Sequence, residues 1–136
     1  MIYGFAAGVF DLLHVGHIAF LNDCRENCDY LMVGLQTNPQ IDRPYKNKPI
    51  QTTFERWMQL LGCKYVDSVM VYDTERDLEN FLAMETELHK RFIGDDHILD
   101  HPTGYEITQK RGIETVFIPR LHTYSTTELR KRIGLL

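Results

Sequence analysis

Short apolar segments alternate with amphipathic helical segments along the chain, and this alternation restricts the fold more than any other feature. Five segments have the apolar character of buried strands: Ile2–Gly8, Tyr30–Leu35, Tyr65–Val71, Arg91–Gly94 and Glu114–Ile118. Apolar residues at helical spacing predict helices at His17–Asn27, Thr53–Leu61, Leu78–Lys90, Gly104–Arg111 and Ser125–Ile133. Such alternation is typical of a parallel sheet covered on both faces. The sequence therefore predicts an α/β fold, a single Rossmann-like domain over residues 1–136 with a five-stranded parallel sheet and helices on both faces.

The loops that follow the strands are where function is expected, because open parallel sheets bind ligands beyond the carboxyl ends of their strands. One of these loops is long, polar and rich in proline, over Gln36–Gln51.

Charge and composition exclude several classes of partner. Lys and Arg number 15 and Asp and Glu 19, so the net charge is −4. This balance argues against nucleic acid as a partner, and an anionic ligand must be held by local donors. No basic leader precedes the first apolar stretch and no long apolar run is present, which predicts a cytoplasmic protein without a membrane partner.

The three cysteines are expected to be reduced. Cys24 and Cys28 lie four residues apart, and a zinc site with His14 and His17 is one interpretation. Their helical spacing with Ile18 and Leu21 favours small core residues instead.

The first loop combines two glycines and two histidines at the start of a helix. Gly8 and Gly16 let a ligand approach the backbone closely, and His14 and His17 flank Gly16. A helix N-terminus offers free N–H groups and partial positive charge, which suit a phosphate group. Two imidazoles there can add donors to charge that develops on phosphorus.

The last loop predicts a second phosphate site. Ser125 and Glu128 have the spacing of a helix capping box. The hydroxyls of Ser125, Thr126 and Thr127 follow Arg120, whose guanidinium can bind phosphate.

Both loops resemble signatures of one enzyme superfamily. The string Gly8-Val9-Phe10-Asp11-Leu12-Leu13-His14-Val15-Gly16-His17 resembles the HxGH nucleotidyltransferase signature, in particular that of the cytidylyltransferase branch. Arg120 to Thr127 resembles the second signature, R-T-x-G-I-S-T-T, with Thr123 and Tyr124 in place of the glycine and isoleucine. The resemblance covers nearly the whole chain and is strongest to glycerol-3-phosphate cytidylyltransferases.

The resemblance implies roles for residues of this sequence. It implies catalytic roles for His14, His17, Lys46 and Arg120, and acceptor binding by Lys46 and Arg76. Gly94-Asp95-Asp96 resembles the family's nucleotide-side G-D-D, and Arg56 stands at a basic family position or on a helix surface. Nucleotide binding is implied for Gly8, Val9, Phe10, Asp11, Gly16, Lys48, Gly94, Asp95, Tyr124, Ser125, Thr126 and Thr127. No protein metal ligand is expected, since Mg²⁺ would arrive with the nucleoside triphosphate.

The function implied is transfer of CMP from CTP to a small phosphorylated alcohol or sugar, with glycerol 3-phosphate favoured, and release of pyrophosphate. A homodimer is implied by the same resemblance. Two alternatives stay open: an adenylyltransferase that uses ATP, as heptose-phosphate, pantetheine-phosphate and nicotinamide-mononucleotide adenylyltransferases do, and a non-catalytic nucleotide-binding module. A plain dinucleotide-binding domain is disfavoured, because the first loop lacks the G-x-G-x-x-G turn.

Overall fold

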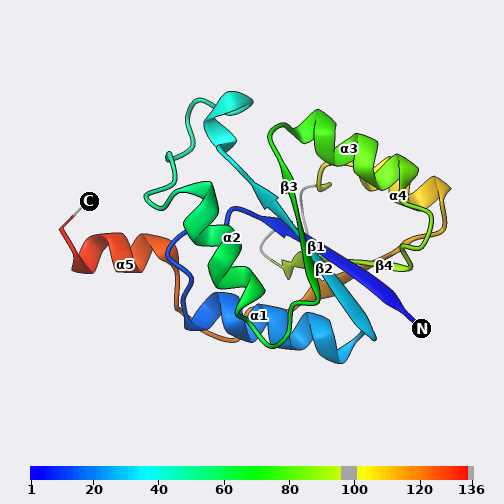
Figure 1. Cartoon of the computed structure of the whole chain (residues 1–136), viewed down its shortest axis with the longest axis horizontal. Coiled ribbons are helices and arrows are strands. Elements are labelled where there is room, and N and C mark those ends of the chain that lie inside the picture. The colour runs from blue at the N-terminus through cyan, green and yellow to red at the C-terminus, as the bar shows by residue number, and fades with distance from the viewer. Residues whose placement is uncertain (96–100, 135–136) are drawn as a thin grey trace.

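A computed structural model describes residues 1–95 and 101–134 and contains a five-stranded parallel sheet (Figure 1). Asp96 lies outside the described residues. The strands are β1 (Tyr3–Gly8), β2 (Tyr30–Gln36), β3 (Ser68–Tyr72), β4 (Lys90–Gly94) and β5 (Glu114–Ile118). Their order in the sheet is β3-β2-β1-β4-β5, and every neighbouring pair is parallel. The predicted α/β fold class is confirmed.

Helices cover both faces of the sheet because side chains alternate between the faces along each strand. Ala6 of β1 packs into one core cluster, which includes Leu21 and Cys24 of α1 and Leu60 of α2. Phe5 packs into the other, with residues of α3 and α4. The helices are α1 (Val15–Glu26), the 3-10 turn η1 (Pro39–Ile41), α2 (Thr53–Leu61), α3 (Glu75–Met84), α4 (Tyr105–Lys110) and α5 (Thr126–Arg132).

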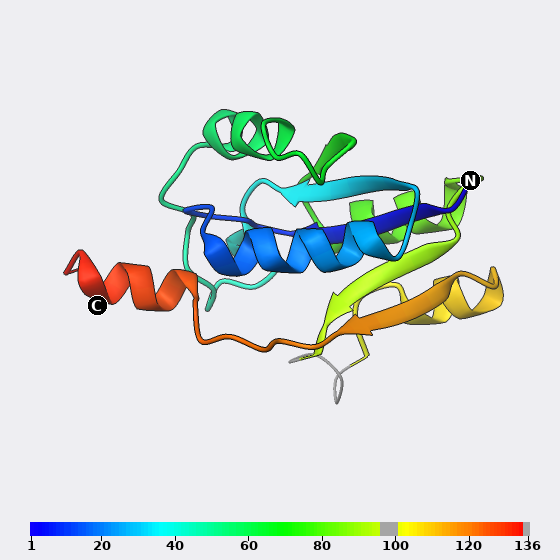
Figure 2. The same cartoon turned by 90° about the horizontal axis from the view of Figure 1, so that it is seen from below.

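The last helix, α5, stands apart from both layers. In Figures 1 and 2 it extends beyond the sheet, at the end of the molecule opposite the N-terminus. It contains no buried residue. None of the helices in the described part of the chain is long and apolar enough to cross a membrane.

Two helices begin earlier than the sequence predicts, and capping explains both. The Nδ1 atom of His14 accepts a hydrogen bond from the backbone N–H of Gly16, so α1 starts at Val15 and not at His17. The hydroxyl of Thr74 accepts from the N–H of Asp77, so α3 starts at Glu75 instead of Leu78. This helix also ends at Met84, before the predicted end at Lys90, because the chain has turned back to the sheet by His89, whose N–H donates to Tyr3.

The third strand begins three residues later than predicted, at Ser68 instead of Tyr65. The N–H of Val66 bonds to the carbonyl of Cys63 in a turn, and the carboxylate of Asp67 accepts from the N–H of Leu31. These bonds delay the entry of the chain into the sheet.

All three cysteines are free and buried. The Cys28 thiol donates to the Cys24 carbonyl at 3.4 Å, and burial raises the pKa of both thiols. Together with Leu21 they belong to the core cluster beneath α1, as their spacing predicts.

Candidate functional site

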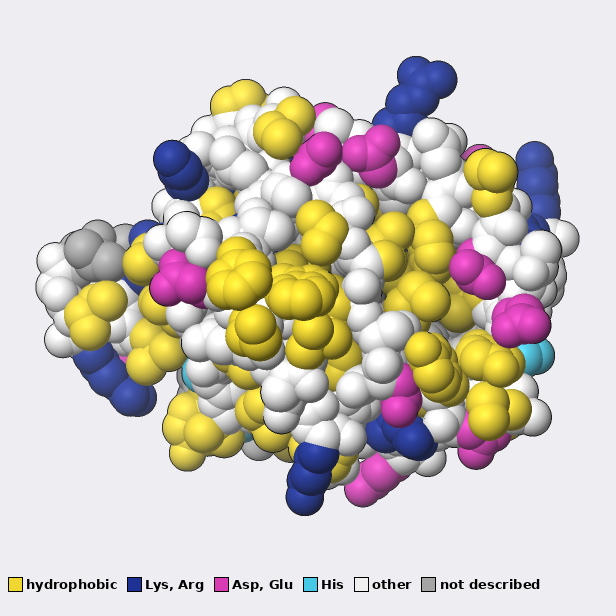
Figure 3. All heavy atoms as spheres, in the orientation of Figure 1, with side chains coloured by type: hydrophobic (Ala, Val, Ile, Leu, Met, Phe, Trp, Pro, Cys, Tyr) yellow, Lys and Arg dark blue, Asp and Glu magenta, His cyan; other side chains and the backbone are white. Residues whose placement is uncertain are grey.

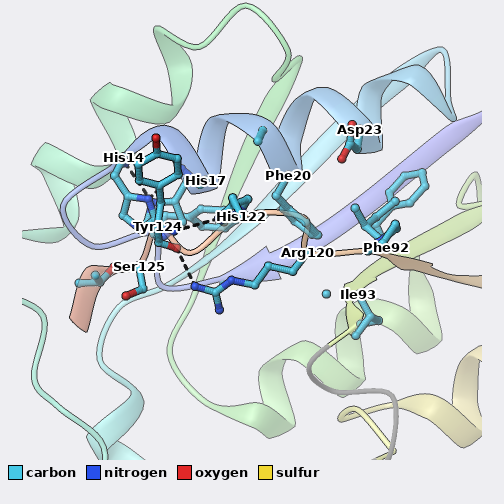
Figure 4. A pocket seen from close by; sticks show the side chains of 18 of the residues that line it. His14, His17, Phe20, Asp23, Phe92, Ile93, Arg120, His122, Tyr124 and Ser125 are labelled. Atoms are coloured by element: carbon cyan, nitrogen blue, oxygen red, sulfur yellow. Dashed lines mark hydrogen bonds between the residues drawn. The ribbon is translucent and has the colours of Figure 1, made fainter. Parts of the chain in front are cut away.

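A cavity of about 550 Å³ opens at the carboxyl ends of β1, β4 and β5 (Figure 4). Its walls come from the loop after β1, the first turns of α1, the end of β4 and the segment between β5 and α5. The lining residues predicted from sequence are Gly8, Val9, Phe10, His14, Gly16, His17, Gly94, Arg120, Tyr124, Ser125 and Thr126. Phe20, Phe92, Ile93 and Ile118 make much of the remaining wall apolar.

His14 and His17 lie side by side at the start of α1. Their ring centroids are 3.8 Å apart, at an interplanar angle of 29°. The Nδ1 of His14 accepts from Gly16 N–H at 3.0 Å, and the Nδ1 of His17 accepts from His14 N–H at 3.2 Å. In the neutral rings the proton is therefore on Nε2, and each histidine has one donor left for a ligand.

Both histidines are held in the neutral form. Burial, the neighbouring His14 and the positive charge of Arg120 lower the pKa of His17 to about 3. Burial, His122 and Arg120 lower the pKa of His14 as well. A neutral imidazole at this position serves as a hydrogen-bond donor without carrying a permanent charge.

The loop after β1 has a strained backbone. Phe10 and Leu12 have φ angles of 50° and 52°, in the left-handed region that non-glycine residues rarely adopt. Asp11 between them is buried, and its two carboxylate oxygens accept from the N–H groups of Ile50 and Gln51. The amide oxygen of Gln51 in turn accepts from Leu12 N–H. Asp11 thus joins the first loop to the segment before α2 and does not line the larger cavity.

Arg56, in the first turn of α2, is 1% exposed and contacts the same loop from the interior of the protein. Its guanidinium donates to the carbonyls of Val9 at 3.0 Å, Gln36 at 2.7 Å and Thr37 at 2.6 Å, while Nε donates to Gln51. The loops after β1 and β2 are therefore fixed to one another by a single buried cation. The helix-surface interpretation drawn from the sequence is wrong, because the side chain is buried and its donors are used by backbone carbonyls.

The segment before α5 forms the other side of the cavity. Arg120 donates from Nη2 to the carbonyl of Tyr124 at 2.6 Å, and the Ser125 hydroxyl caps α5 by accepting from Glu128 N–H. Thr126 Oγ1 donates to the carbonyl of Asp11 at 3.1 Å, which ties this segment to the first loop.

A second cavity of about 320 Å³ adjoins the first, and His17, Thr126, Val9 and Phe10 line both. Its other side chains include the predicted Lys46, Asp11 and Thr127 and two arginines that the sequence analysis missed, Arg43 and Arg130. Arg43 pairs with Glu75 at 2.8 Å, and Arg130 donates to the Lys48 carbonyl at 3.0 Å and lies 3.7 Å from the Asp11 carboxylate. No motif marks either arginine, because each reaches the cavity from a different element.

Three predicted site residues line neither cavity. Lys48 is exposed and contributes its carbonyl to Arg130. Arg76 is exposed on α3 and does not reach the second cavity. Arg43, from the loop after β2, is an arginine that does line it. Asp95 directly follows Gly94, and only Gly94 reaches the cavity wall.

Residues 1–95 and 101–134 contain no group of three or more His, Cys, Asp or Glu side chains arranged to hold a metal ion. The Asp11 oxygens are already used by backbone N–H groups, and Asp23, on the third turn of α1, is a carboxylate in the larger cavity. These residues do not form a metal centre of their own.

Comparison with known proteins finds related sequences that match nearly the whole chain. The sequence profile described as cytidylyltransferase-like matches residues 5–132. The bifunctional protein HldE of Nitrobacter hamburgensis is 33% identical over 132 residues, which is 96% of this chain and 27% of that protein. HldE of Hyphomonas neptunium is 32% identical over 130 residues. The chain spans about a quarter of the length of these relatives.

Solved structures share the fold. A lipopolysaccharide core biosynthesis protein from Thermoplasma volcanium superposes with a TM-score of 0.71 at 26% identity, over 92% of this chain and 99% of that one. TmcAL from Thermotoga maritima, bound with alpha-thio ATP, gives a TM-score of 0.74 at 13% identity, over 98% of this chain and 50% of that one. The latter is a likeness of fold alone.

Proposed function

The chain belongs to the cytidylyltransferase-like family and is a nucleotidyltransferase, and from this we propose that it transfers AMP from ATP to a sugar phosphate with release of pyrophosphate. The family and the enzyme class predicted from sequence are confirmed. The relatives favour the adenylyltransferase alternative over CTP and glycerol 3-phosphate. Support comes from the HldE proteins and from the lipopolysaccharide core biosynthesis protein of T. volcanium.

The two adjoining cavities support this proposal, and the position of His17 in the wall of both is the observation that carries it. The larger cavity has the apolar side chains that suit a base and ribose. The smaller one has Arg43, Lys46 and Arg130, which suit the phosphate of an acceptor. The reacting α-phosphorus would then lie at the junction, beside His17.

In the proposed step an oxygen of the acceptor phosphate attacks the α-phosphorus of ATP. The new P–O bond forms as the bond to the β-phosphate oxygen breaks, and pyrophosphate leaves with that electron pair. The phosphate oxygen that attacks is already anionic, so no base has to remove a proton. Catalysis is then positioning plus charge stabilisation.

Each side chain has a separate part in this step. The Nε2–H groups of His14 and His17 donate to oxygens of the α-phosphate as negative charge increases there. Arg120, Ser125 and Thr126 bind the remaining phosphates, and Lys46 neutralises the acceptor. Mg²⁺ remains part of the proposal as a companion of the nucleotide. It would be held by phosphate oxygens and water, since the described residues form no metal centre.

A homodimer also remains part of the proposal. β3 is an edge strand, and the neighbouring face carries exposed apolar side chains at Phe54, Met58, Leu61 and Val71 (Figure 3). An unpaired edge beside an apolar surface is the kind of face that a second copy covers. Analytical ultracentrifugation of the wild type and of Met58→Glu tests this, and a monomeric wild type would contradict it.

The test of the activity is pyrophosphate release in the presence of Mg²⁺, with ATP or CTP and a panel of acceptors. The panel contains pentose, hexose and heptose phosphates and glycerol 3-phosphate. We expect release with ATP and a sugar phosphate, and release that is roughly 10²–10³-fold slower with the His17→Ala variant. Release only with CTP and glycerol 3-phosphate would overturn the proposal and favour the cytidylyl transfer expected from the sequence. Nucleotide binding without any release would favour a non-catalytic module.

A further inference from the structure

We propose that His122 is a third histidine that donates a hydrogen bond to the phosphate chain of the bound nucleotide. The inference rests on the proposed function and adds a residue that neither signature assigns. His122 stands at the unspecified position of the second signature, between Leu121 and Thr123.

The position of His122 places it with the two signature histidines. Its side chain lines the larger cavity together with His14 and His17, as Figure 4 shows. A Cβ atom built on Gly16 would lie 2.7 Å from Cε1 of His122 and 2.8 Å from Cε1 of His14. Both rings therefore approach the same glycine at the first turn of α1. They can do so only because this residue has no side chain.

The orientation of the His122 ring is fixed in the same way as that of the other two. Its Nδ1 accepts a hydrogen bond from the backbone N–H of Tyr124 at 3.2 Å. The Tyr124 ring lies beside it, with centroids 5.8 Å apart. In the neutral form the proton is on Nε2.

The Nε2 donors of all three histidines are available. Within residues 1–95 and 101–134, no oxygen accepts a hydrogen bond from Nε2 of His14, His17 or His122. The same residues hold no metal centre that would use these nitrogens as ligands. Arg120 adds positive charge to the same wall, so the acceptor that fits best is an anion.

Two substitutions separate a phosphate contact from a purely structural role. The bond from Tyr124 N–H to His122 joins residues i+2 and i, the geometry of an Asx turn, in which an asparagine oxygen accepts the same bond. His122→Asn therefore retains the turn and removes the Nε2 donor, whereas His122→Ala removes both. Thr123→Ala is the matched control, because Thr123 is exposed and lines neither cavity.

The experiment measures the binding of ATP and of adenosine by calorimetry to the wild type and the three variants. We expect both His122 variants to bind ATP about tenfold or more weakly. We expect adenosine affinity to change little, and Thr123→Ala to bind both ligands like the wild type.

Two results would overturn the inference. Wild-type ATP affinity in His122→Asn would mean that the ring only stabilises the turn. An equal loss for ATP and adenosine would mean that it contacts the nucleoside or supports the fold. A wild-type chain that binds no ATP would instead refute the proposed function itself, and the inference with it.

Discussion

The backbone N–H of His14 donates to Nδ1 of His17 over 3.2 Å, so the residue that caps α1 also sets the protonated nitrogen of its neighbour. The cap and the proposed catalytic pair are thus one structure. A substitution at either histidine changes both the helix start and the donors that face the cavity.

Replacement of His17 by alanine is expected to lower turnover by roughly 10²–10³-fold while the fold is retained, because one preorganised donor is lost. Steady-state pyrophosphate release measures the loss, and circular dichroism checks the fold. His101→Ala is the control, since His101 is exposed and lines neither cavity. Turnover near the wild-type value in His17→Ala would remove His17 from the reaction.

Acid should destabilise the protein through His17. Its pKa is about 3 in the folded chain against 6.5 for an unperturbed histidine, so between these values the unfolded chain binds a proton that the folded chain does not. The stabilisation that depends on neutral His17 is fully present above about pH 6.5 and is lost as the pH falls toward about 3.

Urea unfolding of the wild type and of His17→Gln at pH values of about 7 and about 5 tests this. Between these two pH values we expect the free energy of unfolding of the wild type to fall by about 2 kcal/mol more than that of the variant. This follows from about 1.4 kcal/mol per pH unit for one proton. Equal losses in the two proteins would contradict the effect.

Gly16→Ala should impair turnover without unfolding the chain. The added Cβ would lie within 3 Å of ring atoms of His14 and His122, so both rings must move. Misplaced catalytic groups cost on the order of 10²-fold in rate. Gly62→Ala is the control, because the atoms nearest to its Cβ would be 3.5 Å away. Full turnover in Gly16→Ala would mean that the positions of the His14 and His122 rings do not matter for the reaction.

Arg56→Ala should cost about 3 kcal/mol or more of unfolding free energy, because it leaves several buried carbonyls without donors. The exposed Arg76→Ala should change stability by no more than about 0.5 kcal/mol. Chemical denaturation of both variants compares the two. Similar stabilities would show that the buried guanidinium does not hold the loops together.

Arg43→Gln is expected to raise the KM for the acceptor about tenfold, with little change in nucleotide affinity, because Arg43 lines only the smaller cavity. Arg25→Gln is a matched control. Arg25 also pairs with a carboxylate and has the same side-chain exposure of 35%, and it lines neither cavity. A weaker affinity for ATP in Arg43→Gln would argue against separate subsites.

The sequence predicted those parts of the site that depend on short spacing. His14 and His17 are three residues apart at a helix start, so their proximity is local. Arg56 was not placed correctly, because its partners are carbonyls as far as 47 residues away, and a carbonyl has no signature in a sequence. Arg43 and Arg130 were missed for a related reason, since only the folded chain brings them together.

The boundaries of the helices were likewise predicted only as far as local spacing determines them. The apolar spacing of α1 and α3 predicted that both helices exist, but the caps at His14 and Thr74 determine where they begin. The order β3-β2-β1-β4-β5 depends on which crossovers pass which edge, and no local pattern contains that information.

The absence of a buried residue in α5 has a consequence for the exit of products. Residues such as Thr126 and Arg130 hold this helix through hydrogen bonds to the loops beneath it, whereas α1 is anchored in the core. Local opening costs least where few apolar contacts must be broken. The side of the larger cavity next to α5 should therefore open at a lower cost than the side formed by α1, and in the proposed reaction pyrophosphate would leave on that side.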